Sequence, residues 1–188
     1  MNIVIFGPPG AGKGTQSKFI VEKFNMYQLS TGEFLRNEMS KKTEVGEKFS
    51  SVINAGALVS DGIVSDLIEK IISNEQYQNR IIFDGYPRNL NQAKNLENLL
   101  KKYNQKIGIV LKLSVGLKTI KKRISERLDI EKRSDDNEKI AIKRYETYEK
   151  STEPVIEYYK KLNLLKVVDG ERPIDQINKE ISDIISLI

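Results

Sequence analysis

The chain has 188 residues, of which 39% are hydrophobic and 30% charged; this suits one folded domain with a sizeable core and excludes a disordered or collagenous chain. It contains no cysteine and no histidine, so disulfides and an ordinary zinc site are excluded. The formal charge of +5 indicates either a lysine-rich surface or an anionic partner.

Residues 2–6 are rich in β-branched side chains and predict a buried strand. The glycine-rich stretch 7–15 follows, and an amphipathic helix begins just after Lys13. This order of elements is the context of a phosphate-binding loop, in which backbone N–H groups, the helix N-terminus and the lysine face nucleotide phosphates. The usual pattern has Ser or Thr directly after the lysine. Here Gly14 stands there and Thr15 follows, which leaves the hydroxyl contact to Mg²⁺ open.

The rest of the chain alternates strands and helices. Further strands are predicted over 27–30, 80–84, 107–113 and 164–169. Helices are predicted over about 31–41, 43–55, 61–71, 91–103, 116–128, 137–150 and 174–188, and one more helix is predicted to begin near Pro154. Strands separated by helices imply a parallel sheet with right-handed crossovers. Ligands bind such sheets beyond the carboxyl ends of the strands. Gly7, Thr31, Asp84 and Ser114 all fall at strand ends, so their motifs are expected to meet at one edge.

Charged side chains follow the third predicted strand. Asp84 ends that strand, where P-loop proteins place the carboxylate that organises Mg²⁺, and Arg88 comes four residues later. Only eight of the 31 basic residues are arginines, whose planar fork suits phosphate oxygens. Arg123 and Arg127 lie four apart on one helix. Arg144 lies in the apolar stripe of another, where its charge calls for a partner, either an internal acid or a ligand.

At this point the chain resembles the nucleoside monophosphate kinases, and closely the adenylate kinases, over almost its whole length. In that family Gly-Lys-Gly-Thr is the normal form of the phosphate loop. The resemblance is carried by 7–15, 29–36, 56–59, 84–88 with Gln92, 133–136, 152–154 with 158–159, and 168–170.

The resemblance implies a P-loop α/β fold in which helices flank a parallel five-stranded sheet, in a single domain over 1–188. It implies an AMP-binding insertion at about 30–59 and a short lid at about 127–137. The implied reaction is the reversible transfer ATP + AMP = 2 ADP, with Mg²⁺ as the cofactor and no zinc. The expected partners are ATP, AMP and ADP, with no nucleic acid and no membrane, and the expected state is a monomer.

The resemblance also carries residue roles onto this sequence. Asp84 would hold Mg²⁺ through water, and Thr15 is a second candidate. ATP would be bound by Gly10, Ala11, Gly12, Lys13, Gly14, Thr15, Arg123, Arg127 and Arg172. AMP would be bound by Thr31, Arg36, Ala57, Leu58, Val59, Gly85, Tyr86, Pro87, Arg88, Gln92, Arg133 and Arg144. The transfer itself would depend on Lys13, Arg88, Arg123, Arg127, Arg133 and Arg144.

Three other functions would each account for part of this sequence. A UMP/CMP kinase shares the fold, but Thr31 and Gln92 favour adenine, since a glutamine amide pairs with its donor–acceptor edge. A basic nucleic-acid-binding module would have clustered basic and aromatic residues on one face. A GTPase would have Asn-Lys-x-Asp after the fourth strand, and that motif is absent. With neither a signal-peptide pattern nor a bilayer-length apolar run, the protein is expected in the cytoplasm.

Overall fold

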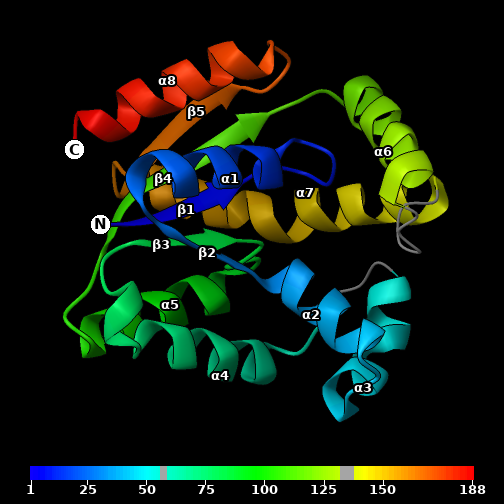
Figure 1. Ribbon diagram of the computed structural model, residues 1–188, viewed down its shortest axis with the longest axis horizontal. Helices are drawn as coiled ribbons and strands as arrows, with labels where there is room; N and C mark the ends of the chain where they lie inside the picture. The colour runs from blue at the N-terminus through cyan, green and yellow to red at the C-terminus, as the bar shows by residue number, and fades with distance from the viewer. Residues whose placement is uncertain (56–58, 132–137) are drawn as a thin grey trace.

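The protein is built on a five-stranded parallel sheet, seen here in a computed structural model that describes residues 1–55, 59–131 and 138–188 (Figure 1). The strand order is β2-β3-β1-β4-β5 and every pairing is parallel, which confirms the predicted fold class. The register pairs Ile5 and Ser30 with Asp84, so the strands end at one edge. The strands are β1 Asn2–Phe6, β2 Tyr27–Ser30, β3 Ile81–Asp84, β4 Ile107–Ser114 and β5 Leu165–Asp169.

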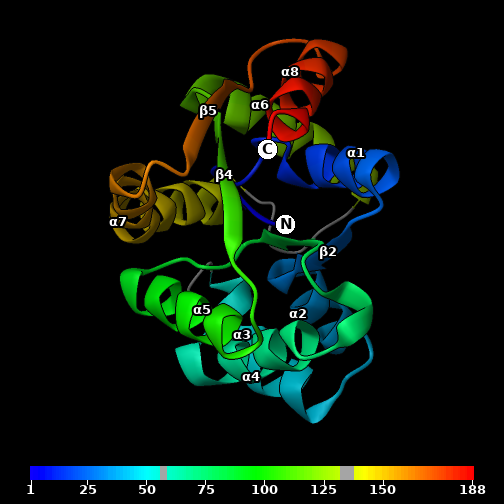
Figure 2. The same cartoon turned by 90° about the vertical axis from the view of Figure 1, so that its left-hand side faces the viewer.

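Helices cover both faces of the sheet because successive strand side chains point to opposite sides. Val4 and Phe6 of β1 join the core cluster under α4, α5 and α7, and Ile3 and Ile5 join the cluster under α1 and α8. Figure 2 shows α1 and α8 on one side of the sheet and α5 and α7 on the other. The helices are α1 Lys13–Phe24, α2 Thr31–Ser40, α3 Glu44–Asn54, α4 Asp61–Ile72, α5 Leu90–Lys102, α6 Leu117–Glu131, α7 Glu138–Lys161 and α8 Ile174–Ser186, with a short 3₁₀ helix at Glu75–Tyr77.

The segment 138–161 corrects one prediction. We expected one helix to end near residue 150 and another to begin near Pro154, but α7 is continuous and Pro154 lies inside it. Proline removes one backbone N–H and disfavours a helix interior. Burial of Val155, Ile156 and Tyr159 against the core keeps the helix on the same line.

Two helices stand apart from the sheet layers. α2 and α3 follow β2 and lie toward the end of the molecule to which the strands point, as does α6 (Figure 1). α6 runs on to Glu131, so residues 129–131 are helical although the predicted helix ended at 128. Within the three described ranges, no helix is long and apolar enough to cross a membrane.

Candidate active site

A cavity of about 1190 Å³ lies at the carboxyl edge of the sheet. It brings together residues from the phosphate loop, α2, the end of β3, α6 and α7, as the strand-end motifs predicted. The predicted site residues that line it are Gly10, Gly12, Lys13, Gly14, Thr15, Arg36, Asp84, Gly85, Arg88, Arg127 and Arg144.

The phosphate loop between β1 and α1 requires glycine at two positions. Gly12 is the residue before α1 and has φ +93°, and Gly10 has φ +82°, both in the left-handed region that favours glycine. A Cβ on Gly10 would also lie 3.1 Å from Ile124 Cγ1 and 3.2 Å from the Ile120 carbonyl oxygen. Ala11 is buried, its N–H donates to the Pro8 carbonyl at 3.1 Å, and it is not among the residues that line the cavity. The loop thus presents bare backbone and a helix N-terminus to the cavity.

The ammonium of Lys13 is held by its own loop. Its Nζ donates to the Gly7 carbonyl at 2.7 Å and to the Pro8 carbonyl at 3.2 Å. Burial lowers the pKa of Lys13 to about 8; the neighbouring arginines, foremost Arg88, lower it too, and Asp84 acts in the opposite direction. The site therefore disfavours positive charge in the absence of an anion.

Asp84 is buried at the end of β3, with 7% of its surface exposed. Its Oδ2 accepts a hydrogen bond from Gln28 Nε2 at 3.0 Å, which fixes the carboxylate from the neighbouring strand β2. The hydroxyl-bearing Thr15 lines the same cavity. A carboxylate and a hydroxyl beside a phosphate loop are oxygen donors of the kind Mg²⁺ takes, because it binds through few protein groups plus substrate phosphates. These residues fit that ion.

The segment after β3 is held tightly around one carbonyl. The Gly85 oxygen accepts from Thr31 Oγ1 at 2.9 Å and from Arg88 Nε at 2.7 Å. Gly85 has φ +80°, and a Cβ there would lie 2.9 Å from Thr31 Oγ1, so only glycine fits. Burial and the neighbouring Arg144 lower the pKa of Arg88 to about 10, against an opposing effect of Asp84.

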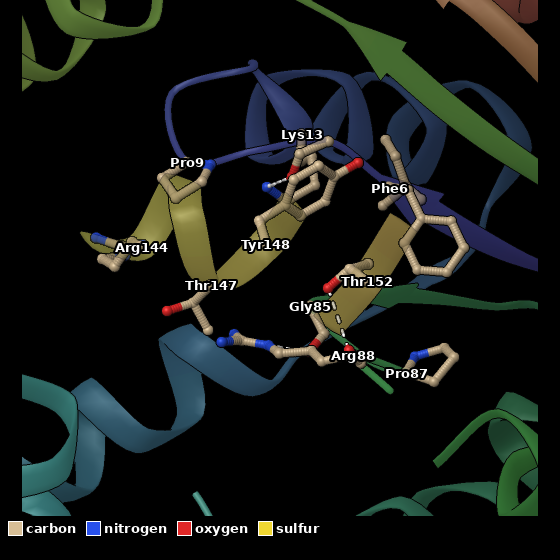
Figure 3. Close-up of a pocket in the computed structure, with 12 residues that line it drawn as sticks. Phe6, Pro9, Lys13, Gly85, Pro87, Arg88, Arg144, Thr147, Tyr148 and Thr152 are labelled. Carbon is tan, nitrogen blue, oxygen red and sulfur yellow. Dashed lines mark hydrogen bonds between the residues drawn. The ribbon is translucent and has the colours of Figure 1, made fainter. Parts of the chain in front are cut away.

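A second, smaller cavity of about 90 Å³ lies beside Lys13, which is one of the residues that line it (Figure 3). Pro87 and Arg88 line it at the bottom of the view, and Thr147, Tyr148 and Thr152 of α7 also line it. The Thr152 hydroxyl donates to the Arg88 carbonyl at 3.2 Å. The Tyr148 hydroxyl is buried without a hydrogen-bond partner in the described part of the chain. Our sequence reading did not assign these α7 residues to the site, and neither did it assign Gln28.

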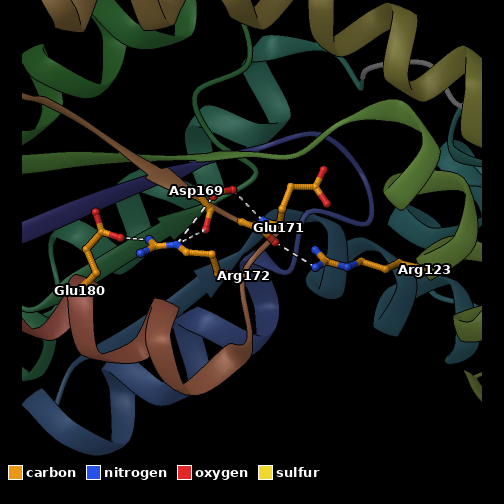
Figure 4. A network of polar contacts seen from close by, with 6 residues as sticks. Arg123, Asp169, Glu171, Arg172 and Glu180 are labelled. Atoms are coloured by element: carbon orange, nitrogen blue, oxygen red, sulfur yellow. Dashed lines mark hydrogen bonds and ion pairs between the residues drawn. The ribbon is translucent and has the colours of Figure 1, made fainter.

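Two predicted ATP-binding arginines do not line the described cavity. Arg123 Nη2 donates to the Gly170 carbonyl at 2.9 Å. Arg172 pairs with Glu180 and donates to the Asp169 carbonyl at 3.3 Å (Figure 4). Both side chains therefore meet the segment that joins β5 to α8.

The predicted base-reading residues are buried. Thr31 is 3% and Gln92 4% exposed, and Gln92 bonds Asp61 and the backbone N–H of Arg88. Tyr86 is 1% exposed, and its hydroxyl accepts from Asn95 at 3.3 Å. Val59 is also buried. Three predicted site residues, Ala57, Leu58 and Arg133, lie outside the described residues.

A glycine-rich loop at a helix N-terminus, a carboxylate at the next strand and converging cations define a P-loop phosphotransferase. The sequence profile of the family called adenylate kinase matches residues 5–164. The adenylate kinase of Pelagibacter ubique is 44% identical over 213 aligned residues that cover 100% of both chains. Those of Azobacteroides pseudotrichonymphae and Bartonella quintana are 42% and 40% identical, over 96% of this chain and 95% and 97% of theirs. The chain belongs to the adenylate kinase family.

Proposed function

We propose that this chain carries out the reaction ATP + AMP ⇌ 2 ADP in the cavity at the carboxyl edge of the sheet, as an adenylate kinase. One observation carries the proposal: Lys13, Arg36, Arg88, Arg127 and Arg144 surround the cavity that Asp84 enters. Two phosphorylated substrates that meet there bring enough negative charge to match these cations. The attacking AMP phosphate is already an anion, so no general base is needed and catalysis rests on alignment and charge neutralisation.

On the donor side, the backbone N–H groups of residues 10–15 bind the ATP phosphates. Lys13 exchanges the carbonyls of Gly7 and Pro8 for phosphate oxygens, and Arg127 contacts the same phosphates. Asp84 and Thr15 would hold Mg²⁺, Asp84 through water, and the ion would supply positive charge to the transferred group. Arg123 and Arg172 meet ATP from the β5–α8 side. Their contacts to the 169–170 segment support this, because that segment ends beside the phosphate loop: a Cβ on Gly170 would lie 3.6 Å from the Ala11 carbonyl oxygen.

On the acceptor side, Arg36, Arg88 and Arg144 bind the AMP phosphate, and Thr31 and Gln92 select the base. The segment 85–88 and Val59 complete this side. Arg133, Ala57 and Leu58 are assigned to the acceptor and transfer steps by the family resemblance alone.

The two insertions are part of the same proposal. The AMP-binding insertion of about 30–59 contains α2 and α3, and the lid of about 127–137 begins in the last turn of α6. The alignment with the Pelagibacter ubique protein is longer than this chain, so that relative has residues that this chain lacks, as a shorter lid here would require. We further propose a cytoplasmic monomer.

The test is the substitution Lys13→Met. Methionine has nearly the length of lysine but lacks the positive charge that Lys13 would bring to the β- and γ-phosphates of ATP. We therefore expect ADP formation to fall by about 10²-fold or more while the melting temperature changes little. A coupled assay with ATP and each of AMP, UMP, CMP and GMP defines the acceptor, and AMP is expected to lead UMP and CMP by at least about a hundredfold. Turnover by Lys13→Met within a few-fold of wild type would overturn the assignment of the loop.

A further inference from the structure

The side-chain amide of Gln92 is held at both ends. Its Nε2 donates to Asp61 Oδ1 at 2.7 Å, and its Oε1 accepts the backbone N–H of Arg88 at 2.7 Å. The side chain is 4% exposed, so little water reaches it to replace a lost partner. Both contacts are as short as charge-assisted or well-aligned hydrogen bonds.

These two partners fix which end of the amide is which. A carboxylate only accepts hydrogen bonds, and a backbone N–H only donates them. If the amide turned over, its oxygen would face Asp61 and its NH₂ would face the N–H of Arg88, and both contacts would become repulsive. Gln92 therefore has one orientation in this network.

Asp61 is itself fixed in place. The Asn89 Nδ2 donates to its two oxygens at 3.1 and 3.3 Å, and the Asn89 Oδ1 accepts the backbone N–H of Gln92 at 2.8 Å. Asn89 is the residue before α5, and Asp61 is the first residue of α4. The start of α4 is thus tied to the start of α5 through the residue that orients Gln92.

The fixed amide has one donor and one acceptor site left, one at each end. A 6-aminopurine presents a donor at its amino group next to an acceptor at N1. A 6-oxopurine presents the reverse order, an acceptor at O6 next to a donor at N1. An amide that cannot turn over satisfies one order and meets the other with two repulsions, as Asn and Gln do when they read adenine in nucleic acids.

We propose that Asp61 is a specificity-determining residue: by fixing the orientation of the Gln92 amide, it makes the acceptor site favour a 6-aminopurine monophosphate over a 6-oxopurine monophosphate. Asp61 acts through Gln92 and is therefore a positioning residue. The inference rests on the proposed role of Gln92 in recognising the acceptor base. It adds the residue that determines which end of the Gln92 amide faces which atom of the base.

The experiment compares kcat/KM for AMP and for IMP, which differ only in the 6-substituent and the proton at N1. The proteins are wild type, Asp61→Ala, Asp61→Asn, Gln92→Ala and, as a matched control, Asp66→Asn, an exposed acid on the same helix. We expect the AMP:IMP ratio to fall roughly tenfold in Asp61→Ala, the equivalent of about one hydrogen bond to a charged group. The AMP:IMP ratio falls less in Asp61→Asn, because the amide oxygen of that variant can still accept a hydrogen bond from Gln92. The KM for ATP stays at its wild-type value in each variant, and the AMP:IMP ratio stays at its wild-type value in Asp66→Asn.

The outcomes separate this inference from the proposed function. If Gln92→Ala lowers the AMP:IMP ratio and Asp61→Ala leaves it within about twofold, Asp61 does not set the orientation and the role of Gln92 stands. If Gln92→Ala itself leaves the ratio unchanged, the base is read elsewhere and both statements fall. Equal losses with AMP and IMP in Asp61→Ala would show a structural role only. Melting curves accompany each variant, and Asp61→Asn, which keeps the shape of the side chain, carries the test should Asp61→Ala not fold.

Discussion

Lys13 occupies an environment that disfavours its own charge. Its ammonium bonds two carbonyls of its own loop, Gly7 and Pro8, and burial together with the nearby arginines brings its pKa to about 8. Nucleotide phosphates favour the ammonium form and therefore raise this pKa on binding. A group whose pKa rises on binding takes up a proton at any pH between the two values.

We therefore predict that ATP binding takes up protons near pH 8. At that pH about half of the unbound molecules lack the Lys13 proton, so uptake approaches 0.5 proton per ATP, and it vanishes at pH 6.5, where the unbound lysine is already charged. Calorimetry of ATP binding in two buffers of different ionisation enthalpy measures the number. Lys13→Met removes the uptake. The same uptake in Lys13→Met as in wild type would place the titrating group elsewhere.

The sequence predicts these residues unequally. Lys13 and Asp84 follow from local pattern, because each has a fixed place relative to a strand end. The contact of Gln28 with Asp84 joins residues 56 positions apart and depends on the register of β2 against β3. The partner of Gln92, 31 positions away in α4, was likewise beyond sequence reasoning. Local sequence patterns predict the side chains that face a ligand. The side chains that position them come from distant parts of the chain and are identified only in the folded structure.

Among the elements, the β5–α8 connection is tied to α6 by a carboxylate. Glu171 Oε1 accepts the Gly116 N–H at 2.6 Å, and its Oε2 accepts from Thr119 Oγ1 at 2.6 Å (Figure 4 shows Glu171 beside Arg123). These hydrogen bonds lower the pKa of Glu171, so it remains an anion at the N-terminus of α6. α6 carries Arg123 and Arg127, so this bridge positions both arginines relative to the connection.

Glu171→Gln is therefore predicted to weaken ATP binding more than AMP binding. The amide can keep its oxygen on the Gly116 N–H and turn its NH₂ toward the Thr119 hydroxyl, but it loses the negative charge that strengthens both hydrogen bonds and suits the N-terminus of α6. We expect the KM for ATP to rise roughly threefold or more, with the KM for AMP unchanged. Thr119→Val removes one partner from the other side, and the double variant should cost less than the sum of the two single changes. Asp175→Asn, an exposed acid in the first turn of α8, is the control. Additive effects would show that the bridge does not act as a unit.

The elements themselves were largely readable from the sequence, and the exception is informative. Strand and helix periods identify β1 to β5 and most helices because hydrophobic spacing is a local property. Pro154 is also a local signal, and it predicted a helix start that does not occur. Buried contacts of Val155, Ile156 and Tyr159, together with the hydrogen bond of Thr152 to the Arg88 carbonyl, outweigh one missing backbone hydrogen bond. Tertiary packing decided that element.

At the scale of the whole molecule, basic side chains from several elements converge where the ligand is expected. The chain has a formal net charge of +5, and six cationic side chains line the cavity that Asp84 also lines: Lys13, Lys18, Arg36, Arg88, Arg127 and Arg144. Their mutual repulsion contributes to the lowered pKa values of Lys13 and Arg88. A convergent cluster of this kind suits a compact polyphosphate, whereas a nucleic-acid backbone calls for a basic groove with aromatic side chains along it.

A basic chain suggests two kinds of anionic partner, a nucleic acid or a nucleotide such as ATP, and salt dependence distinguishes the two. Binding to nucleic acid through scattered surface lysines is counterion release, which weakens steeply with salt. We predict that the protein is retained on single-stranded DNA and RNA only at low ionic strength and is released near physiological salt. ATP at about 100 times its dissociation constant still stabilises the fold there by about 2.7 kcal/mol, a rise in melting temperature of roughly 5–10 °C. Column retention and thermal melts at the same ionic strength measure both. Persistent, sequence-independent retention without stabilisation by ATP would assign the basic surface to nucleic acid instead.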